Sequence, residues 1–184
     1  MCPALTQTIR DRRTIHHFKI GEVPPTSMIE EAIEQAVWAP NHRLSQPWHF
    51  QLIGSESAAQ ICHLNADIVR ADKGEEMAEI KLRRWSEIPG WLSMSFDKSE
   101  DPLRSQEDYA ACCCVAQNLA LILWEQGVGM KWTTGKVTRD EGFYEIIGLD
   151  SQSSSVVGLF WFGYPVEIPQ ATRPPLATFL SRLP

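Results

Sequence analysis

The chain has 184 residues, of which 22% are charged and 43% hydrophobic, a balance typical of a globular protein rather than a disordered one. Its formal net charge of −6 argues against nucleic acid or an anionic membrane as the main partner. The five cysteines include three in succession and no Cys-x-x-Cys pair, which disfavours a disulfide framework and a zinc site. We therefore expect one domain over residues 1–184, cytoplasmic, with no metal and no membrane segment.

The first half of the chain predicts helices separated by one strand. Residues 1–12 suit a short helix, and Ser27 with Glu30 forms a capping box for a second helix that Pro40 ends. The apolar residues within 49–53 predict a strand. Apolar residues at helical spacing then predict helices over 57–69 and 75–85.

The second half predicts three strands around a central helix. Strands are expected over 91–96, 130–133 and 156–162, with a polar loop over 97–105 and a nearly all-apolar helix over 109–125. Thr138 and Glu141 form a capping box for a short helix, and the proline-rich tail from Pro165 should be extended. This order predicts an α+β domain of three layers around a mixed, mainly antiparallel sheet.

The connector over residues 38–50 is unusually rich in functional side chains. It reads Trp-Ala-Pro-Asn-His-Arg-Leu-Ser-Gln-Pro-Trp-His-Phe, whereas an ordinary connection needs only a few turn residues. This composition indicates the rim of a ligand site.

The segment Arg12-Arg13-Thr14 follows directly on the first predicted helix. Two guanidinium groups and a hydroxyl are suited to bind a phosphate, because the forked donors match its oxygens. The alternative interpretation is a solvated helix end whose cations complement the helix dipole.

Taken together, these segments resemble the nitroreductase family of FMN-dependent oxidoreductases. The resemblance lies in the first motif, the helix end, the strand entry, the central helix and the closing segment, which are residues 12–18, 36–40, 45–50, 116–129, and 163–165 with 173–174. These motifs cover nearly the whole chain in the family's order. The length and the segment 132–135 are most similar to a compact branch of the family.

The resemblance implies an FMN site shared by two subunits. Cofactor contacts would come from Arg12, Arg13, Thr14, Trp38, Asn41, His42, Trp132, Thr133, Thr134, Gly135 and Arg173. The arginines would bind the FMN phosphate and ring edge, and Thr14 the phosphate or ribityl chain. The backbone over 132–135 would approach the isoalloxazine, where a glycine permits close contact.

The resemblance also implies a homodimer, in which the connector residues 38, 41 and 42 reach the flavin held mainly by the partner subunit and the C-terminal tail extends toward that subunit. No catalytic side chain is expected, because the cofactor performs the redox step. His17 stands in the first motif where many family members have a basic residue, which weakens the positive charge there.

Other residues allow more than one interpretation. His42 could be a flavin-side donor, whereas His49 is expected on the surface of its strand. Cys112–Cys114 point in three directions around a helix and are expected to pack in the core. Trp85 and Trp91 either pack in the core or close the mouth of the pocket.

The resemblance thus implies an enzyme that takes hydride from NADH or NADPH and reduces a nitroaromatic, quinone or similar acceptor by a ping-pong mechanism. The alternative is a flavin-binding carrier or regulatory protein without independent reductase activity. A third interpretation, a dimer with merely solvated arginines, leaves the connector unexplained. The physiological acceptor and the preferred nicotinamide stay open.

Overall fold

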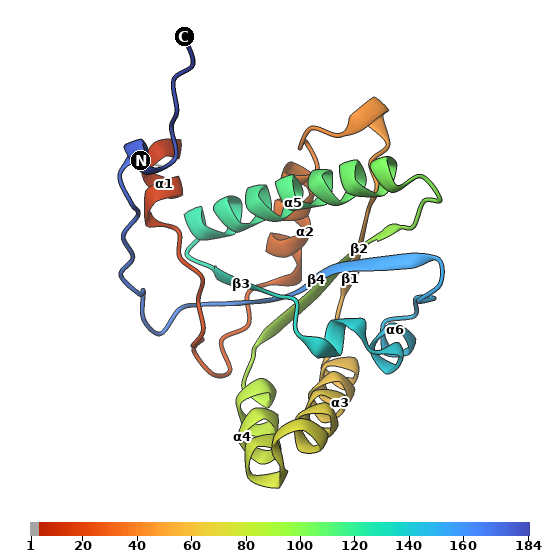
Figure 1. The fold of residues 1–184 in the computed structure, drawn as a ribbon. Coiled ribbons are helices and arrows are strands. Elements are labelled where there is room, and N and C mark those ends of the chain that lie inside the picture. Colours follow the sequence, from red (N-terminus) through yellow and green to blue (C-terminus); the bar gives the residue numbers. More distant parts are fainter. Residues whose placement is uncertain (1–3) are drawn as a thin grey trace.

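The centre of the fold is a four-stranded sheet, seen in a computed structural model that describes residues 4–184 (Figure 1). The strand order is β1-β2-β4-β3, and the strands are β1 (Trp48–Leu52), β2 (Gly90–Asp97), β3 (Gly129–Thr133) and β4 (Ser154–Gly163). The central strands β2 and β4 are buried along almost their whole length. A continuously apolar sequence such as that of β4 forms a strand covered on both faces.

All three strand pairings are antiparallel, so the expectation of a mixed sheet was wrong for the strands themselves. The parallel element is a single bridge between Thr14 and Met130, where the extended chain after the first helix lies along β3. That segment makes too few ladder contacts to count as a strand.

One face of the sheet is covered by α2 (Thr26–Ala36) and α5 (Pro102–Glu125) (Figure 1). Their apolar residues pack with Leu92 and Phe160 of the central strands in one core cluster. The central helix α5 lies against this face along most of its length. No helix within residues 4–184 is long and apolar enough to span a lipid bilayer.

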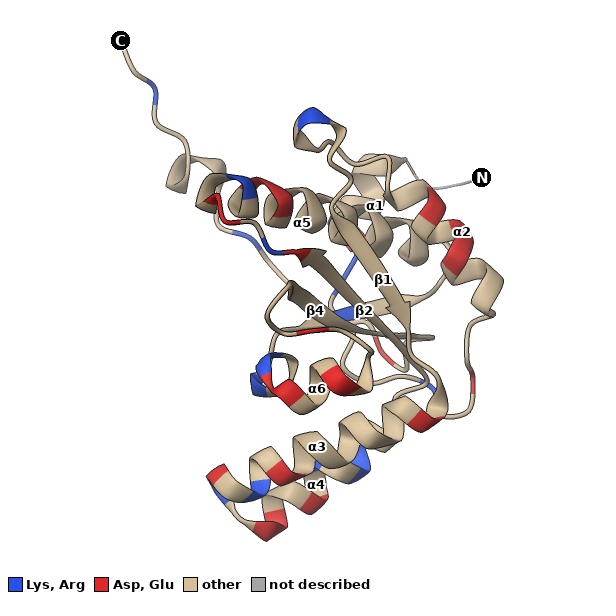
Figure 2. Ribbon diagram, turned by 90° about the vertical axis from the view of Figure 1, so that its right-hand side faces the viewer, with Lys and Arg blue, Asp and Glu red and all other residues tan. Residues whose placement is uncertain are grey.

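The opposite face is covered by α3 (Ser55–Lys73), α4 (Glu75–Ser86) and α6 (Glu141–Ile146), with the 3-10 turn η2 (Lys136–Arg139) beside them. Figure 2 shows that charged residues of both signs occur along α3 and α4. Under this layer Trp85, Trp91 and Trp161 form a cluster with ring centroids 4.9 to 5.8 Å apart. The layer order therefore matches the predicted three-layer α+β architecture.

The short helix α1 (Leu5–Asp11) and the end of the C-terminal tail lie apart. They overlap in the view of Figure 1, but Figure 2 shows α1 toward one edge of the molecule and the C-terminal end, after the one ordered turn η3 (Leu176–Thr178), toward the opposite edge. The tail begins as an extended strip, because Lys19 N donates to Tyr164 O at 2.9 Å and Val166 N donates to His17 O at 3.1 Å. This confirms the extended tail predicted from its prolines.

Three helix starts differ from the predictions. Helix α2 begins at Thr26 after Pro25 and has no side-chain cap, so Ser27 is not an N-cap. Helix α5 begins seven residues before Tyr109, because Asp101 accepts a hydrogen bond from Leu103 N and Pro102 occupies the first turn. These capping residues had been assigned to a loop.

The third difference concerns α6. Its N-cap is Asp140, which accepts a hydrogen bond from Gly142 N at 2.9 Å. The hydroxyl of Thr138 instead donates to Gly135 O at 3.0 Å. The predicted capping residue therefore closes the 3-10 turn before the helix.

Candidate functional site

A basic cavity of about 260 Å³ lies between α4 and the outer strand β3. Its lining includes His16, Lys81, Arg84 and Lys131, which come from three separate segments of the chain, and no carboxylate lines it. In a chain with a net charge of −6, such a concentration of cations is a local feature of this cavity. It is suited to an anionic ligand.

Lys131 is the most constrained of these cations. Its side chain is partly buried, and Nζ lies 4.4 Å from the centroid of the Trp161 ring, a cation–π contact. Burial, followed by the nearby charges of Lys81 and Arg84, lowers the pKa of Lys131. Among the described residues no carboxylate lies within ion-pair distance of these three cations. The cavity thus lacks the counter-ion that partly buried positive charge requires.

Two buried donors in the same cavity have no hydrogen-bond partner within residues 4–184. They are Nδ2 of Asn65, a residue that is 8% exposed, and Nε1 of Trp161, which is 6% exposed. A buried donor left unpaired costs about 1–3 kcal/mol. Both atoms have almost no solvent-exposed surface, so a ligand would bond to them only if the lining of the cavity shifted.

The end of β3 leaves open space beside this cavity. A Cβ placed on Gly135 would meet only Oγ1 of Thr133, at 3.9 Å. Thr133 and Lys131 lie on the same face of β3, because side chains alternate along a strand. The backbone at Gly135 can therefore be approached closely by a ligand.

Trp132 lies on the other face of β3. Its Nε1 donates to Val157 O at 3.1 Å, and its ring packs against Phe160 with centroids 5.4 Å apart. The indole fits there because β4 has Gly158, where a Cβ would lie 2.0 Å from Nε1. The structure thus separates the Trp132 side chain from the cavity, and only the backbone of this residue faces the ligand side.

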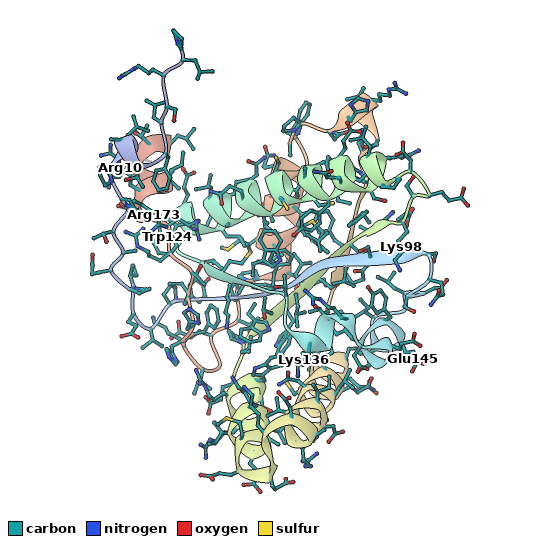
Figure 3. The ribbon with its side chains drawn as sticks, viewed as in Figure 1. Arg10, Lys98, Trp124, Lys136, Glu145 and Arg173 are labelled. Atoms are coloured by element: carbon teal, nitrogen blue, oxygen red, sulfur yellow. The ribbon has the colours of Figure 1, made fainter. Side chains whose placement is uncertain are left out.

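Arg12 lies at the end of α1, close to a residue from the opposite end of the chain. Burial lowers the pKa of Arg12, and the charges of Arg13 and Arg173 lower it further. Figure 3 shows Arg173 in the tail, on the same side of this view as Arg10 of α1 and Trp124 at the end of α5. Arg12 and Arg173, both predicted phosphate ligands, are therefore brought together.

Arg13 is held to the backbone through one of its nitrogens. Its Nη1 donates to the carbonyl oxygens of Arg10 and Arg12, the latter at 2.9 Å, at the C-terminal end of α1. Its Nε is buried and has no hydrogen-bond partner within residues 4–184, and its contact with the ring edge stays a prediction.

His16, rather than His17, reaches the cavity. Ile15 N donates to Met130 O at 3.2 Å and its side chain is fully buried, which leaves Thr14 and His16 on the outer side of this extended segment. Burial lowers the pKa of His16, and Lys131 lowers it further. His16 thus lines the cavity, and the effect of His17 in the motif stays a prediction.

The connector residues lie far from this cavity within one chain. Figure 1 places η1 (His42–Leu44) on the α5 side of the sheet, whereas the cavity lies on the α4 side. Trp38 is 85% exposed, and His42 Nδ1 lies 3.6 Å from a carboxylate oxygen of Glu107 on α5. Neither residue approaches Arg12 of its own chain.

Asn41 holds the connector in a constrained shape. Its Nδ2 donates to Ala39 O at 3.2 Å, and its Oδ1 accepts from Gln46 N at 3.0 Å. Arg43, Leu44 and Gln46 all have positive φ angles, between 44° and 55°. Non-glycine residues in this region store strain, and such strain is concentrated at functional segments.

The remaining candidates are structural. Cys112 is buried, and burial raises its pKa to about 12, whereas Cys113 is partly exposed and Cys114 exposed. The core prediction thus holds for the first of the three cysteines. Trp85 packs in the tryptophan cluster and also lines the cavity, while His49 is an exposed neighbour of Asp97 at 3.4 Å. Within residues 4–184 no group of three potential metal ligands is found.

Comparison with known proteins gives the family. Residues 9–164 match the Nitroreductase family. This chain belongs to the nitroreductase family. It is 33% identical over 174 residues to YfhC of Bacillus subtilis, a protein named as an NAD(P)H nitroreductase, and the match covers 92% of this chain and 88% of YfhC.

Solved structures of nitroreductases share the fold. A nitroreductase-like family protein from Bacillus cereus has a TM-score of 0.86 and 26% identity, covering 100% of this chain and 97% of the other. A nitroreductase from Desulfovibrio desulfuricans, solved in complex with FMN, has a TM-score of 0.78 and 20% identity, covering 99% and 98%. At that identity the second likeness shows the fold alone.

In this nitroreductase the sequence motifs did not reveal most of the cavity. Lys81, Arg84 and Asn65 lie on surface helices whose docking angle no local pattern specifies. Lys131 had a detectable signal, since it is a charged residue inside a strand two positions before Thr133. Alternation along that strand places both on one face.

Proposed function

We propose that this protein is an FMN-dependent oxidoreductase that takes hydride from NAD(P)H and reduces a nitroaromatic, quinone or similar acceptor. The observation that carries the proposal is the basic cavity, with its unpaired cations and buried unpaired donors, beside the motif Arg12–His16. Two relatives support it by name, since YfhC is named for NAD(P)H and the D. desulfuricans protein was solved with FMN.

The residues present fit FMN. Arg12 and Arg173 would hold the phosphate, because Arg173 lies near enough to lower the pKa of Arg12, after the larger effects of burial and of Arg13, and a dianion near both guanidinium groups would offset their repulsion. Thr14 on the exposed side of the same segment would add a hydroxyl donor. The ring would lie toward the basic cavity, whose lining includes Asn65.

Bound FMN would supply the redox chemistry, exchanging hydride and electrons with the two substrates in turn. The chain's own contribution is electrostatic. Lys131 would face the pyrimidine end of the ring, where negative charge accumulates on reduction, and a fixed cation there favours the reduced state. His16, whose pKa is lowered, would add an imidazole hydrogen bond rather than a fixed charge. The backbone amides at Thr134 and Gly135 would donate to the ring edge, since neither donates to another group of the described residues.

We further propose a homodimer with a shared site. Helix α5 has no charged residue from Tyr109 to Trp124, yet Tyr109 and Cys114 on it are exposed. The tail exposes Leu176 and Phe179, which are 70% and 71% exposed. Apolar surface of this extent is typical of a subunit interface. In the dimer, the strained connector with Trp38 would reach the partner's flavin, and the tail would pack on the partner.

The test is a titration of flavin-depleted protein with FMN, followed by tryptophan emission. Because Trp85 and Trp161 line the cavity, we expect saturable quenching at one FMN per chain. NADH or NADPH added without oxygen should then bleach the bound flavin, and a quinone or nitrofurazone should restore its colour. Arg173→Ala should weaken FMN binding, whereas the matched control Arg182→Ala, in the same exposed tail, should not.

Two results would contradict the proposal in different ways. Absence of FMN binding would remove the flavin site altogether. Binding of FMN that neither nicotinamide reduces would leave the flavin site and favour the carrier or regulatory protein.

A further inference from the structure

Two cations of the basic cavity have no negatively charged partner, even when the charges of the proposed FMN are counted. Lys81 and Arg84 lie three residues apart on α4, so they share one helix face, and both line the cavity. Lys81 is partly exposed and Arg84 is exposed, so an incoming small molecule can reach both. Neither forms an ion pair with a carboxylate of residues 4–184.

The charges of the proposed cofactor do not account for this pair. The phosphate would be held by Arg12 and Arg173 at the end of α1. Two-electron reduction adds one negative charge to the ring, which the partly buried Lys131 is placed to meet. Lys81 and Arg84 are then left as two positive charges facing a cavity that contains no carboxylate.

The positive charges of Lys81 and Arg84 disfavour the protonated forms of the neighbouring Lys131 and His16. Lys81 and Arg84 both lower the pKa of Lys131, and Arg84 also lowers that of His16, after the larger effect of burial. Like charges held together around a cavity repel one another, and an anion between them removes that cost. A guanidinium fork beside an ammonium group is suited to a carboxylate, sulfonate or phosphate.

We infer that Lys81 and Arg84 bind an anionic group of a substrate in the basic cavity, so that the protein favours anionic substrates over neutral ones of equal reactivity. This inference rests on the proposed function. Two sources of the anion are possible, a carboxylate or sulfonate on the acceptor or the additional phosphate that distinguishes NADPH from NADH.

The two half-reactions of the FMN-loaded protein separate these sources. The acceptor arm compares para-nitrobenzoate with para-nitrobenzyl alcohol as oxidants of the reduced protein. The reductant arm compares NADPH with NADH as the agent that bleaches the oxidised protein. The variants are Lys81→Gln with Arg84→Gln, and the matched control is Arg83→Gln, since Arg83 is exposed on the same helix and does not line the cavity.

In one of the two comparisons, we expect the double variant to react about tenfold more slowly with the more anionic substrate, para-nitrobenzoate or NADPH. Its rate with para-nitrobenzyl alcohol or NADH should stay unchanged, because only a charge-assisted contact is lost. Arg83→Gln should keep the preference. Raised salt should weaken the preference of the wild type, because exposed charges are screened. Benzoate, as a binding probe without turnover, should perturb the flavin absorbance of the wild type at lower concentration than that of the double variant.

Three outcomes would overturn the inference. The first is an unchanged preference in both arms. The second is an equal loss for anionic and neutral substrates. The third is weaker FMN binding as the only change, which would assign Lys81 and Arg84 to the cofactor itself. Failure of the proposed function would look different, because the wild type would then bind no FMN or would not be bleached.

Discussion

Gly129 is the position where the first motif is pressed most closely against the sheet. A Cβ at this residue would lie 2.3 Å from Cγ1 and 2.9 Å from Cβ of Ile15, and 3.0 Å from Cγ of Pro165. Carbon atoms in contact prefer about 3.5–4.0 Å. Ile15 is fully buried and cannot turn away into solvent, so Gly129→Ala must push the segment that carries it off β3.

We expect Gly129→Ala to lower the free energy of unfolding by about 1–3 kcal/mol, the usual cost of an overpacked core. Because Ile15 lies between Thr14 and His16, the same shift should displace the predicted ligand groups and weaken FMN binding. Urea unfolding of the flavin-free protein at fixed concentration measures the first effect, and FMN titration measures the second.

Two comparisons make this prediction refutable. Gly54→Ala is the matched control, since no heavy atom lies within 4 Å of its Cβ and its φ of −74° suits alanine, so its effect should stay below about 1 kcal/mol. In an Ile15→Ala background the contact at 2.3 Å with Cγ1 is gone, whereas those with Cβ of residue 15 and Cγ of Pro165 remain, so Gly129→Ala should cost clearly less than in the wild type but more than the Gly54→Ala control. A Gly129→Ala variant as stable as the wild type, or an equal cost in both backgrounds, would refute the reasoning.

Arg12→Ala should raise the dissociation constant of FMN about tenfold or more, since a hydrogen bond to a charged group contributes about 1.5–3 kcal/mol, whereas Arg182→Ala should leave it unchanged; fluorescence titration checks both. Trp132→Phe removes the indole hydrogen bond to β4 and should lower the free energy of unfolding by about 1–3 kcal/mol in urea, and a variant of wild-type stability would contradict the assigned orientation. Burial raises the pKa of Cys62 to about 11 and of Cys112 to about 12, above the ordinary value of 9.0. The folded state therefore holds these thiols neutral, and the stability they contribute is present below about pH 9 and lost as the pH rises through these values, by on the order of 1 kcal/mol per thiol at about pH 10. A free energy of unfolding that stays flat up to about pH 11 would contradict this.

The elements of the fold could be predicted well where the pattern of apolar residues in the sequence matches the pattern of buried residues in the structure. The apolar run within Ser154–Gly163 predicted a strand covered on both sides, and β4 is central in the sheet. Helix starts were less predictable, because serine, threonine and aspartate compete as caps over a few residues. At α6 the N-cap is Asp140, because the hydroxyl of Thr138 donates to the carbonyl oxygen of Gly135 instead.

The candidate site was predictable only in part. Arg12 and Arg173 were found from motifs, and the structure brings them together although they lie at opposite ends of the chain. The cavity itself depends on how α4 docks against β3, which places Arg84 and Lys131 around one space. The local sequence of α4 and of β3 does not specify how closely, or at what angle, the helix docks against the strand. For Arg13 the motif did not predict that Nη1 would bond to the backbone at the end of its own helix.

The central claim is tested most directly by a crystal structure of the protein soaked with FMN. We expect the phosphate between Arg12 and Arg173, the ring in the cavity with Lys131 and His16, and the partner subunit's connector against the ring. Arginines that face solvent beside an empty cavity, at an FMN concentration that saturates the titration, would contradict the account.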